Sequence, residues 1–299
     1  MLQLNKIKTL LSYATKQKYR AELQHALVTP KGISAHDLET GVLIKSIELP
    51  LGVYKIVELG EFCKTSETVK VDDLPNIDWK QKEDDKIHVG IKTLETINKH
   101  SSDDETRIFL NSIYFDSENI VATNSYHLKA VKHDQNINSQ YIIPNGSIDI
   151  LVKLCKAFKT INIKLSFNEN WVTVDTLEFT WQSRLINREY LKYQAVIPKK
   201  WNNKLEIKNF PELKTYKPFL EKRKEKSVIS LVNGEIFFII PSTDIKIKIG
   251  ESDNKDFEIG FNPLFLEIAR ENKRDFIIKW NSELSPVLVN ESIVMPLKL

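Results

Sequence analysis

The sequence contains little cysteine, glycine or proline, and it has no long apolar run. Two cysteines among 299 residues cannot build a disulfide framework or a zinc cluster. The 9 glycines and 11 prolines form no low-complexity linker. No apolar stretch approaches the roughly 20 residues that a membrane-spanning helix needs. The N-terminal residues lack the order of charges and apolar residues of a signal peptide, so we expect a protein of the reducing cytoplasm.

Signatures of catalysis are lacking as well. The six histidines show no spacing typical of metal ligands, and no glycine-rich phosphate loop occurs. Cys155 occupies an apolar position of a predicted helix, which indicates core packing. Three pairs of neighbouring carboxylates fall in polar joints, where solvation explains them: Asp72-Asp73, Asp84-Asp85 and Asp103-Asp104. We therefore expect no catalytic site, no metal and no cofactor.

Charge is nearly balanced over the whole chain but not along it. The formal net charge is only +3, which argues against a globally basic surface for nucleic acid. Helices are predicted at 1–20, 89–100, 144–159, 209–226 and 262–275. Together these segments carry a net charge of +11, which leaves −8 for the rest of the chain. Lysine is common on solvated helix faces, but a set of helices with one sign of charge indicates a surface that meets phosphates.

The order of predicted elements repeats along the chain. Residues 141–175 predict a strand, an amphipathic helix and two further strands, and residues 257–289 predict the same elements at nearly the same spacing. In the second copy, Asn262 and Pro263 form an N-cap and first-turn pair. Three similar α+β modules are therefore predicted, each with helices on one face of a sheet. Their bounds are 1–83, 84–200 and 201–299.

The first module is the least regular. Residues 2–14 have an amphipathic helical pattern, and strands are predicted at 22–29 and 41–48. The stretch 52–71, "GVYKIVELGEFCKTSETVKV", lacks a helical period where the other modules place their second helix. An abbreviated first module is therefore predicted.

Several motifs resemble those of the bacterial sliding clamp, the β subunit of DNA polymerase III. In the middle module, "TRIFLNSIYFD" and "IVATNSYHLKAVK" resemble the family's strand pair and its Ala-Thr-Asp-Gly-His-Arg-Leu motif. "YIIPNGSIDILVKL" resembles its second helix, and "SRLINREYLKYQAVIPK" resembles its Phe-Pro-Asp-Tyr strand. "FEIGFNPLFLEIAR" and the terminal "IVMPLKL" resemble the third domain, whereas only "SAHDLETGV" and "DLPNIDW" align in the first. The resemblance covers residues 87–299 well and 1–86 loosely.

The chain departs from the family pattern in one motif and in length. Residues 124–127 replace the family's Asp-Gly-His-Arg, while Thr123 and Leu128 are kept. The chain is also shorter than family members, mostly in the first module. It therefore resembles a divergent, shortened clamp of the kind that a phage or mobile element carries.

The resemblance implies a function in DNA replication. Family members form a head-to-tail homodimeric ring, in which helices line the inner wall and sheets form the outside. Such a ring encircles double-stranded DNA without sequence preference and acts as a processivity factor. It tethers DNA polymerase and a separate clamp loader through short peptide motifs. By this resemblance the protein is a cytoplasmic, nucleoid-associated accessory subunit and not an enzyme.

The resemblance also implies two sets of site residues. DNA would be contacted by basic side chains and by Phe109, which could stack on a base at a primer junction. The DNA-contact residues are Lys6, Lys8, Lys16, Lys18, Arg20, Lys92, Lys99, Arg107, Phe109, Lys153, Lys156, Lys214, Lys217, Arg270, Lys273 and Arg274. Partner peptides would enter an apolar pocket beside the C-terminal tail, where methionine suits an adaptable surface. This pocket is lined by Leu110, Thr123, Leu128, Pro198, Ile293, Met295, Pro296 and Leu297.

Alternative interpretations stay open at this point. Each lysine could simply be solvated, Phe109 could pack in a sheet, and Ile293 and Met295 could merely close the last strand. The clamp fold could serve as a scaffold that no longer encircles DNA. The chain could also be a DNA- or carbohydrate-modifying α+β enzyme, for which nuclease activity with Mg²⁺ would be evidence.

Overall fold

The computed structural model describes residues 4–15, 20–45, 49–59, 65–66, 68–74, 78–79, 83–210, 212, 227–240, 245–254 and 256–298. The chain forms two compact units. The first contains Met1–Asn98, Ser112–Ile120 and Lys132–Glu189, and the second contains Lys99–Asn111, Val121–Val131 and Tyr190–Leu299.

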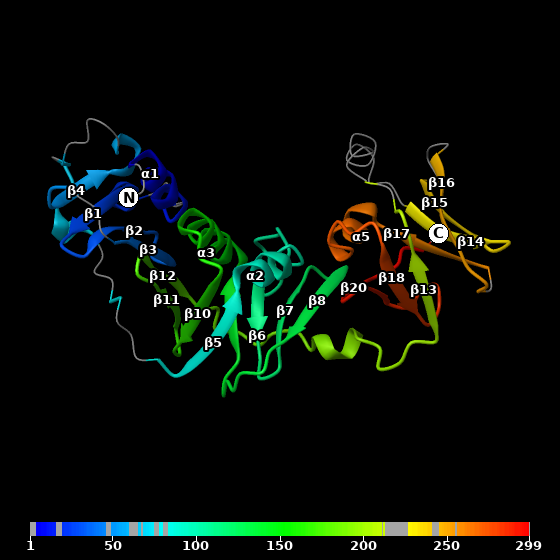
Figure 1. Cartoon of the computed structure of the whole chain (residues 1–299). Coiled ribbons are helices and arrows are strands. Elements are labelled where there is room, and N and C mark those ends of the chain that lie inside the picture. Colours follow the sequence, from blue (N-terminus) through cyan, green and yellow to red (C-terminus); the bar gives the residue numbers. More distant parts are fainter. Residues whose placement is uncertain are drawn as a thin grey trace. The chain divides into compact units, whose positions relative to one another are not determined.

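An antiparallel sheet of eight strands is the base of the first unit (Figure 1). The strands follow the order β4-β1-β2-β3-β12-β11-β10-β5. Their bounds are β1 (His25–Thr29), β2 (Gly32–His36), β3 (Thr40–Ile44), β4 (Gly52–Lys55), β5 (Asp85–Gly90), β10 (Asn162–Phe167), β11 (Trp171–Asp175) and β12 (Phe179–Arg184). β3 pairs with β12, so strands from the predicted first and middle modules belong to one continuous sheet. β6 (Ser112–Phe115) and β9 (Tyr141–Pro144) also pair in this unit.

Three helices lie on one side of this sheet, as Figure 1 shows: α1 (Leu4–Tyr13), α2 (Ile91–Asn98) and α3 (Asn145–Phe158). Each turns an apolar stripe inward, with Leu11, Leu94 and Leu151 fully buried. α3 ends where Lys159 adopts a left-handed backbone with a φ of 58°. Within the described part of the chain, no helix combines the length and the apolar character that crossing a membrane requires.

In its described part, the first module has no α-helix after α1. The described part of residues 52–71 forms strand β4 and the 3₁₀ turns η2 (Ile56–Glu58) and, from its last residue, η3 (Val71–Asp73), without an α-helix. The two predicted strands are found as β1 and β3. β2 and β4 were not predicted, and a further 3₁₀ turn, η1 (Ala21–Gln24), precedes β1.

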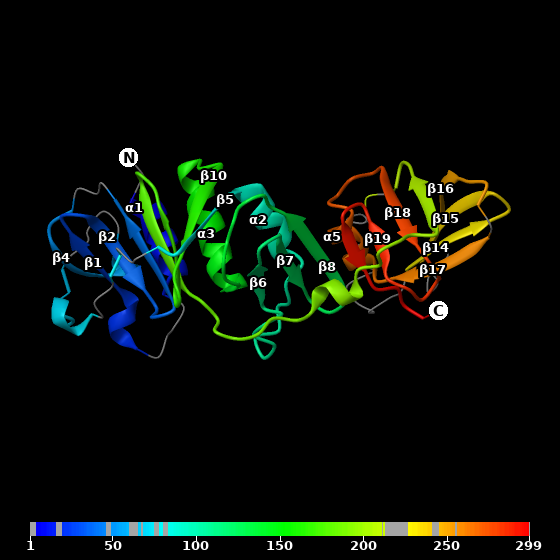
Figure 2. The ribbon, with the colours of Figure 1, turned by 90° about the horizontal axis from the view of Figure 1, so that it is seen from below.

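The second unit packs two groups of strands face to face (Figure 2). One group runs in the order β13-β18-β19-β20-β8-β7, and the other runs in the order β16-β15-β14-β17. Their bounds are β7 (Asn119–Thr123), β8 (His127–Lys132), β13 (Asn203–Ile207), β14 (Ser227–Val232), β15 (Glu235–Ile240), β16 (Ile245–Glu251), β17 (Phe257–Phe261), β18 (Phe276–Trp280), β19 (Val287–Val289) and β20 (Ser292–Val294). The Phe210 ring contacts Phe238 of β15 and Phe276 of β18, so one apolar core holds both groups together.

Helix α5 (Pro263–Ala269) is capped as predicted but shorter than predicted. The Asn262 side chain accepts a hydrogen bond from the Leu264 N–H at 2.9 Å, and Pro263 opens the first turn. The predicted helix over 262–275 is wrong beyond Ala269, because Glu271 and Asn272 adopt positive φ angles of 55° and 59°. The helix predicted over 209–226 falls almost entirely outside the described residues.

Candidate functional site

The C-terminal tail is held by backbone hydrogen bonds. β20 pairs with β19 on one side and with β8 on the other, where Ile293 lies opposite Leu128. Beyond β20, the Met295 N–H donates to the Tyr126 carbonyl at 2.8 Å, and the Leu297 N–H donates to the Gly260 carbonyl at 2.8 Å. The tail is therefore part of the folded unit as far as Leu297.

The β8–β20 pair gathers most of the predicted pocket residues in the second unit. Leu128 and Ile293 are buried, and the Thr123 hydroxyl donates to the His127 carbonyl at 2.8 Å just before β8. Met295, Pro296 and Leu297 are half-buried and follow directly. Leu110 is buried in the loop before β6, and Pro198 is half-buried after the short helix η4 (Tyr193–Val196), which runs beside β8 in both views (Figures 1 and 2).

An aromatic surface next to the tail was missed by the sequence analysis. Tyr126 is 53% exposed, and its ring stacks on Phe265 of α5 with 5.5 Å between the centroids. Leu264, the neighbour of Phe265, is also exposed, as are Leu191 and Val196 around η4. The only signal in the sequence was that Tyr126 stands inside the motif that departs from the family pattern. These side chains form an exposed apolar-aromatic surface next to the predicted pocket residues.

Two buried histidines lie directly beneath this surface. The Nδ1 atoms of His127 and His100 are 2.9 Å apart, and the Phe265 ring meets the His127 ring edge to face at 4.9 Å. Burial lowers the pKa of His127 to about 4. Burial, together with the charges of His127, Lys129 and Lys99, lowers the pKa of His100 to about 2. Spacing along the chain could not reveal this pair, because the fold brings the two rings together.

The helices of the first unit carry a group of lysines on the side away from the sheet. Lys6, Lys92, Lys153 and Lys156 are exposed, and Lys8 is half-buried. Four of them also contact their own unit, and the Lys8 Nζ donates to the Val57 carbonyl. The Lys153 Nζ lies 3.9 Å from the Tyr13 ring centroid, the Lys156 Nζ lies 2.7 Å from Glu95, and the Lys6 Nζ lies 3.4 Å from the Ala157 carbonyl.

The other predicted DNA contacts are scattered over loops. Lys99, Arg107, Lys273 and Arg274 are exposed in the second unit, and Arg20 is exposed in the first. Phe109 is half-buried in the turn before β6, so it does not pack as a strand residue. Lys16, Lys18, Lys214 and Lys217 lie outside the described residues.

Arg270 requires a correction. Its side chain is only 1% exposed, and its guanidinium makes an ion pair with Glu267 and donates to the Lys273 carbonyl. The guanidinium also lies 5.1 Å from the Phe210 ring centroid. The buried Arg270 side chain therefore stabilises the end of α5 and is not available to DNA phosphates. The predicted contact between Arg270 and DNA is withdrawn.

Two buried residues of the first unit, Asp85 and Cys155, have structural roles. Asp85, predicted to be a solvated joint residue, is buried and accepts hydrogen bonds from Tyr141, Asn138 and Ser139. Burial raises the pKa of the Cys155 thiol to about 12, as expected for a core cysteine. The described side chains include no group of three or more histidines, cysteines and carboxylates that could hold a metal ion.

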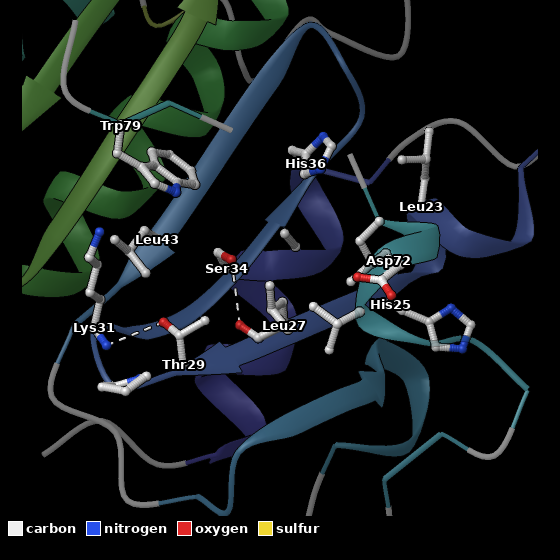
Figure 3. A pocket seen from close by; sticks show the side chains of 14 residues that line it. Leu23, His25, Leu27, Thr29, Lys31, Ser34, His36, Leu43, Asp72 and Trp79 are labelled. Carbon is white, nitrogen blue, oxygen red and sulfur yellow. Dashed lines mark hydrogen bonds between the residues drawn. The ribbon is translucent and has the colours of Figure 1, made fainter. Parts of the chain in front are cut away.

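The first unit has a separate cavity of about 580 Å³ over the outer side of β1, β2 and β3 (Figure 3). Leu27 and Leu43 point into it, and Trp79 closes it from the segment after η3. The Trp79 ring lies so close to Gly41 that a Cβ there would be 3.0 Å from it. Gly41 and Trp79 belong to the two motifs of the first module that resemble the clamp family. The contact between Trp79 and Gly41 thus lies at the edge of the cavity and joins these two motifs of the first module.

Solved structures with a similar fold are sliding clamps. The DNA polymerase III β subunit of Thermotoga maritima has a TM-score of 0.79 and 18% identity, covering 99% of this chain and 97% of that one. The DnaN sliding clamp of Bartonella birtlesii bound to griselimycin has a TM-score of 0.77 and 16% identity, covering 100% and 98%. The Helicobacter pylori β clamp bound to a DNA ligase peptide has a TM-score of 0.76 and 16% identity, covering 99% of both chains. No protein-family model matches the chain, and no curated protein matches it by sequence. The chain therefore has the α+β sliding-clamp fold that its motifs predict.

Proposed function

We propose that this protein is a DNA sliding clamp, a processivity factor that encircles double-stranded DNA and tethers a polymerase. The observation that carries the proposal is the extent of the likeness, because the sliding-clamp fold accounts for 99–100% of this chain and 97–99% of each of those clamps. A fold shared over a whole chain is a stronger argument than one shared module, although the function must still come from the site. The protein would act as an accessory subunit at the nucleoid, without catalysis of its own.

The lysine-bearing helices of the first unit are the proposed DNA-facing surface. Lys6, Lys92, Lys153 and Lys156 are exposed on α1–α3, the helices that lie on one side of the first unit's sheet. Each phosphate contact makes affinity more sensitive to salt, with a slope of about −0.9 per contact. A closed ring is retained by its topology, so its contacts can be few and weak, and weak contacts permit sliding. In the second unit, Lys99, Arg107, Lys273 and Arg274 are the proposed contributors, with Phe109 at a primer junction.

The surface around the β8–β20 pair is the proposed site for partner peptides. Its lining is the predicted set with Tyr126 and Phe265 added, which gives an apolar-aromatic surface supported by a rigid strand pair. The names of the similar structures support this choice, since one clamp is bound to griselimycin and another to a DNA ligase peptide. Here a polymerase and a clamp loader would dock through short apolar-aromatic segments.

A head-to-tail dimer of three-module chains is the proposed assembly, with modules at 1–83, 84–200 and 201–299. The first unit's sheet has β4 as its outermost named strand, where the Val53 carbonyl already accepts from the Ser66 N–H, and the four-stranded sheet ends at β16. The remaining backbone groups of these two strands are the proposed contacts with a second copy. Light scattering tests this assembly, because a ring of two chains has twice the 34.7 kDa of one chain. A single-chain mass at micromolar concentration, unchanged by DNA, would contradict it.

A scaffold with the clamp fold is the second candidate. The ammonium groups of Lys6, Lys153 and Lys156 already contact groups of their own unit. These contacts compete with contacts to DNA phosphates. A scaffold would bind partner peptides without being retained on closed circular DNA, so the two candidates separate in one experiment.

A further inference from the structure

Asn124 has a fixed orientation, because the backbone determines which end of its amide faces His127. Its Oδ1 accepts hydrogen bonds from the N–H groups of Tyr126 and His127, both at 2.9 Å. Its Nδ2 therefore lies toward the Nε2 of His127, at 3.0 Å. An amide nitrogen can only donate, so the Nε2 of His127 must be the unprotonated acceptor.

This orientation determines the tautomers of both histidines. A neutral imidazole carries one N–H, so the proton of His127 is on Nδ1, which donates to the Nδ1 of His100 at 2.9 Å. The proton of His100 is then on Nε2, which donates to the Ser292 hydroxyl at 3.5 Å, the longest link. All three hydrogen bonds run in one direction, from Asn124 to Ser292.

We propose that Asn124, His127, His100 and Ser292 form a directed hydrogen-bond chain that positions the C-terminal tail, and that the two histidines are positioning residues of the peptide site. Ser292 is the first residue of β20, and Met295 is bound by the carbonyl of Tyr126, so both ends of the chain meet the segment that enters the pocket. His127 and His100 are 2% and 0% exposed, so bulk water does not reach the link between the two rings. The positioning role rests on the proposed function, whereas the tautomers do not.

The hydrogen-bond chain has no place for a further proton on either histidine. A proton added to the Nε2 of His127 would face the Asn124 amide donor, and one added to the Nδ1 of His100 would face the N–H of His127. The charged groups nearby oppose protonation too, since Lys129 and Lys99 act on His100, and the carboxylate of Glu271 is paired with Lys129. The remaining neighbour, Phe265, supplies no acceptor oxygen. Protonation of either histidine therefore breaks the hydrogen-bond chain.

Asn124→Asp is the variant that tests the direction of the chain. One carboxylate oxygen can still accept from the two backbone N–H groups, while the other now accepts where Asn124 donated. The Nε2 of His127 must then carry a proton, and the pKa of His127 should rise because a carboxylate favours the imidazolium. The change preserves size and shape, so an effect on the tautomers comes from the reversed hydrogen bond and the added charge, not from packing.

Nitrogen-15 NMR of the histidine rings in the full chain measures the tautomers directly. We expect Nδ1–H for His127 and Nε2–H for His100 in the wild type at pH 7, and a protonated Nε2 on His127 in Asn124→Asp. An Nε2–H tautomer of His127 in the wild type would overturn the proposal, and so would an unchanged tautomer in the variant.

Griselimycin binding, measured by calorimetry, tests the positioning role. His100→Phe keeps a ring but removes both links, and we expect affinity to fall about tenfold, the effect of one lost buried hydrogen bond. The exposed His88 provides the control, because His88→Phe should leave affinity unchanged. Equal affinity for His100→Phe and the wild type would overturn the role.

If the wild type shows the expected tautomers but does not bind, the peptide site itself is refuted, and the positioning role falls with it. Should His100→Phe not fold, Ser292→Ala, which removes only the last link, is measured instead, and affinity equal to that of the wild type would overturn the role.

Discussion

The Nζ of Lys129 lies 2.6 Å from the Oε1 of Glu271, and only 4% of the lysine side chain is exposed. The pair joins β8 to the residues that end α5, and Lys129 also stands opposite Ser292 in the β8–β20 ladder. Burial alone would raise the pKa of Glu271, but the hydrogen bond and charge of Lys129 outweigh it, with help from Lys273, so this pKa is lowered. The ion pair therefore ties together three elements around the tail.

Lys129→Ala should loosen this region. Removing one partner of a buried pair leaves the other uncompensated, which costs about 3 kcal/mol, and less where the remaining group reaches water. Glu271 is 28% exposed, so we expect a loss of about 2 kcal/mol. Hydrogen exchange followed by mass spectrometry should show faster exchange in peptides that contain β8 and β20.

The control is Lys132→Ala, at the exposed end of the same strand. It should leave exchange unchanged. Equal protection of β8 and β20 in both variants would show that the Lys129–Glu271 pair contributes nothing to the stability of the tail.

Removal of residues 295–299 should abolish peptide binding without unfolding the chain. The cut is placed after Val294 because Ile293 and Val294 are buried in β20 and support the core. Met295, Pro296 and Leu297 are only half-buried, so their loss removes a wall of the pocket and little of the core. Calorimetry with griselimycin and light scattering provide the measurements, with undiminished affinity as the contrary outcome.

Lys92→Glu and Lys153→Glu should shorten the lifetime of the protein on DNA without creating sequence preference. Both side chains are exposed on the proposed DNA-facing helices, and the loss of a phosphate contact should reduce the salt slope by about 1 each. Lys86→Glu on strand β5 is the matched control, since Lys86 already pairs with Glu83 at 2.6 Å. The measurement is the single-molecule residence time of each variant on DNA over a series of salt concentrations. If Lys86→Glu matched the helix variants, the assignment of the surface would be wrong.

Local pattern predicted the elements well where the sequence contains its own start and stop signals. α3 was expected at 144–159 and runs from Asn145 to Phe158, and α5 begins at its Asn262 cap. The end of α5 was misplaced because Glu271 and Asn272 look like helix residues but adopt positive φ, with Arg270 buried below them. The burial of Arg270 also depends on its contact with the Phe210 ring, which is distant in the sequence, and periodicity carries no information about that contact.

The candidate site was predictable only through the resemblance. Leu128 and Ile293 were assigned to one pocket because each lies in a family-like motif, and the ladder register places them opposite each other. The pairing of His100 with His127 and the stacking of Tyr126 on Phe265 have no local signal, since each joins segments far apart in the chain. Long-range pairs of this kind require the fold.

The stability of the protein should fall with acid between about pH 6.5 and 4. The pKa of His127 is about 4 in the folded state and near 6.5 when unfolded, so the unfolded state binds more protons in this range. The contribution of His127 is therefore complete above pH 6.5 and is lost as the pH falls, at about 1.4 kcal/mol per pH unit. The pKa of His100 is lowered in the folded state as well, so His100 contributes a second proton that only the unfolded state binds in this range.

Urea unfolding at a series of pH values measures this slope. His127→Gln should reduce it by about one proton, whereas His88→Gln should not. A slope that is the same in His127→Gln and the wild type would mean that the buried pair does not control the acid sensitivity.

Retention on closed circular DNA tests most directly whether the protein surrounds the double helix. The protein is loaded onto a nicked plasmid with a clamp loader, and the complex is separated by gel filtration in salt high enough to remove ordinary DNA-binding proteins. We expect the protein to stay with the circle and to be released when a single cut makes the DNA linear. Release from circle and line at the same rate, or equal retention on both, would contradict the account.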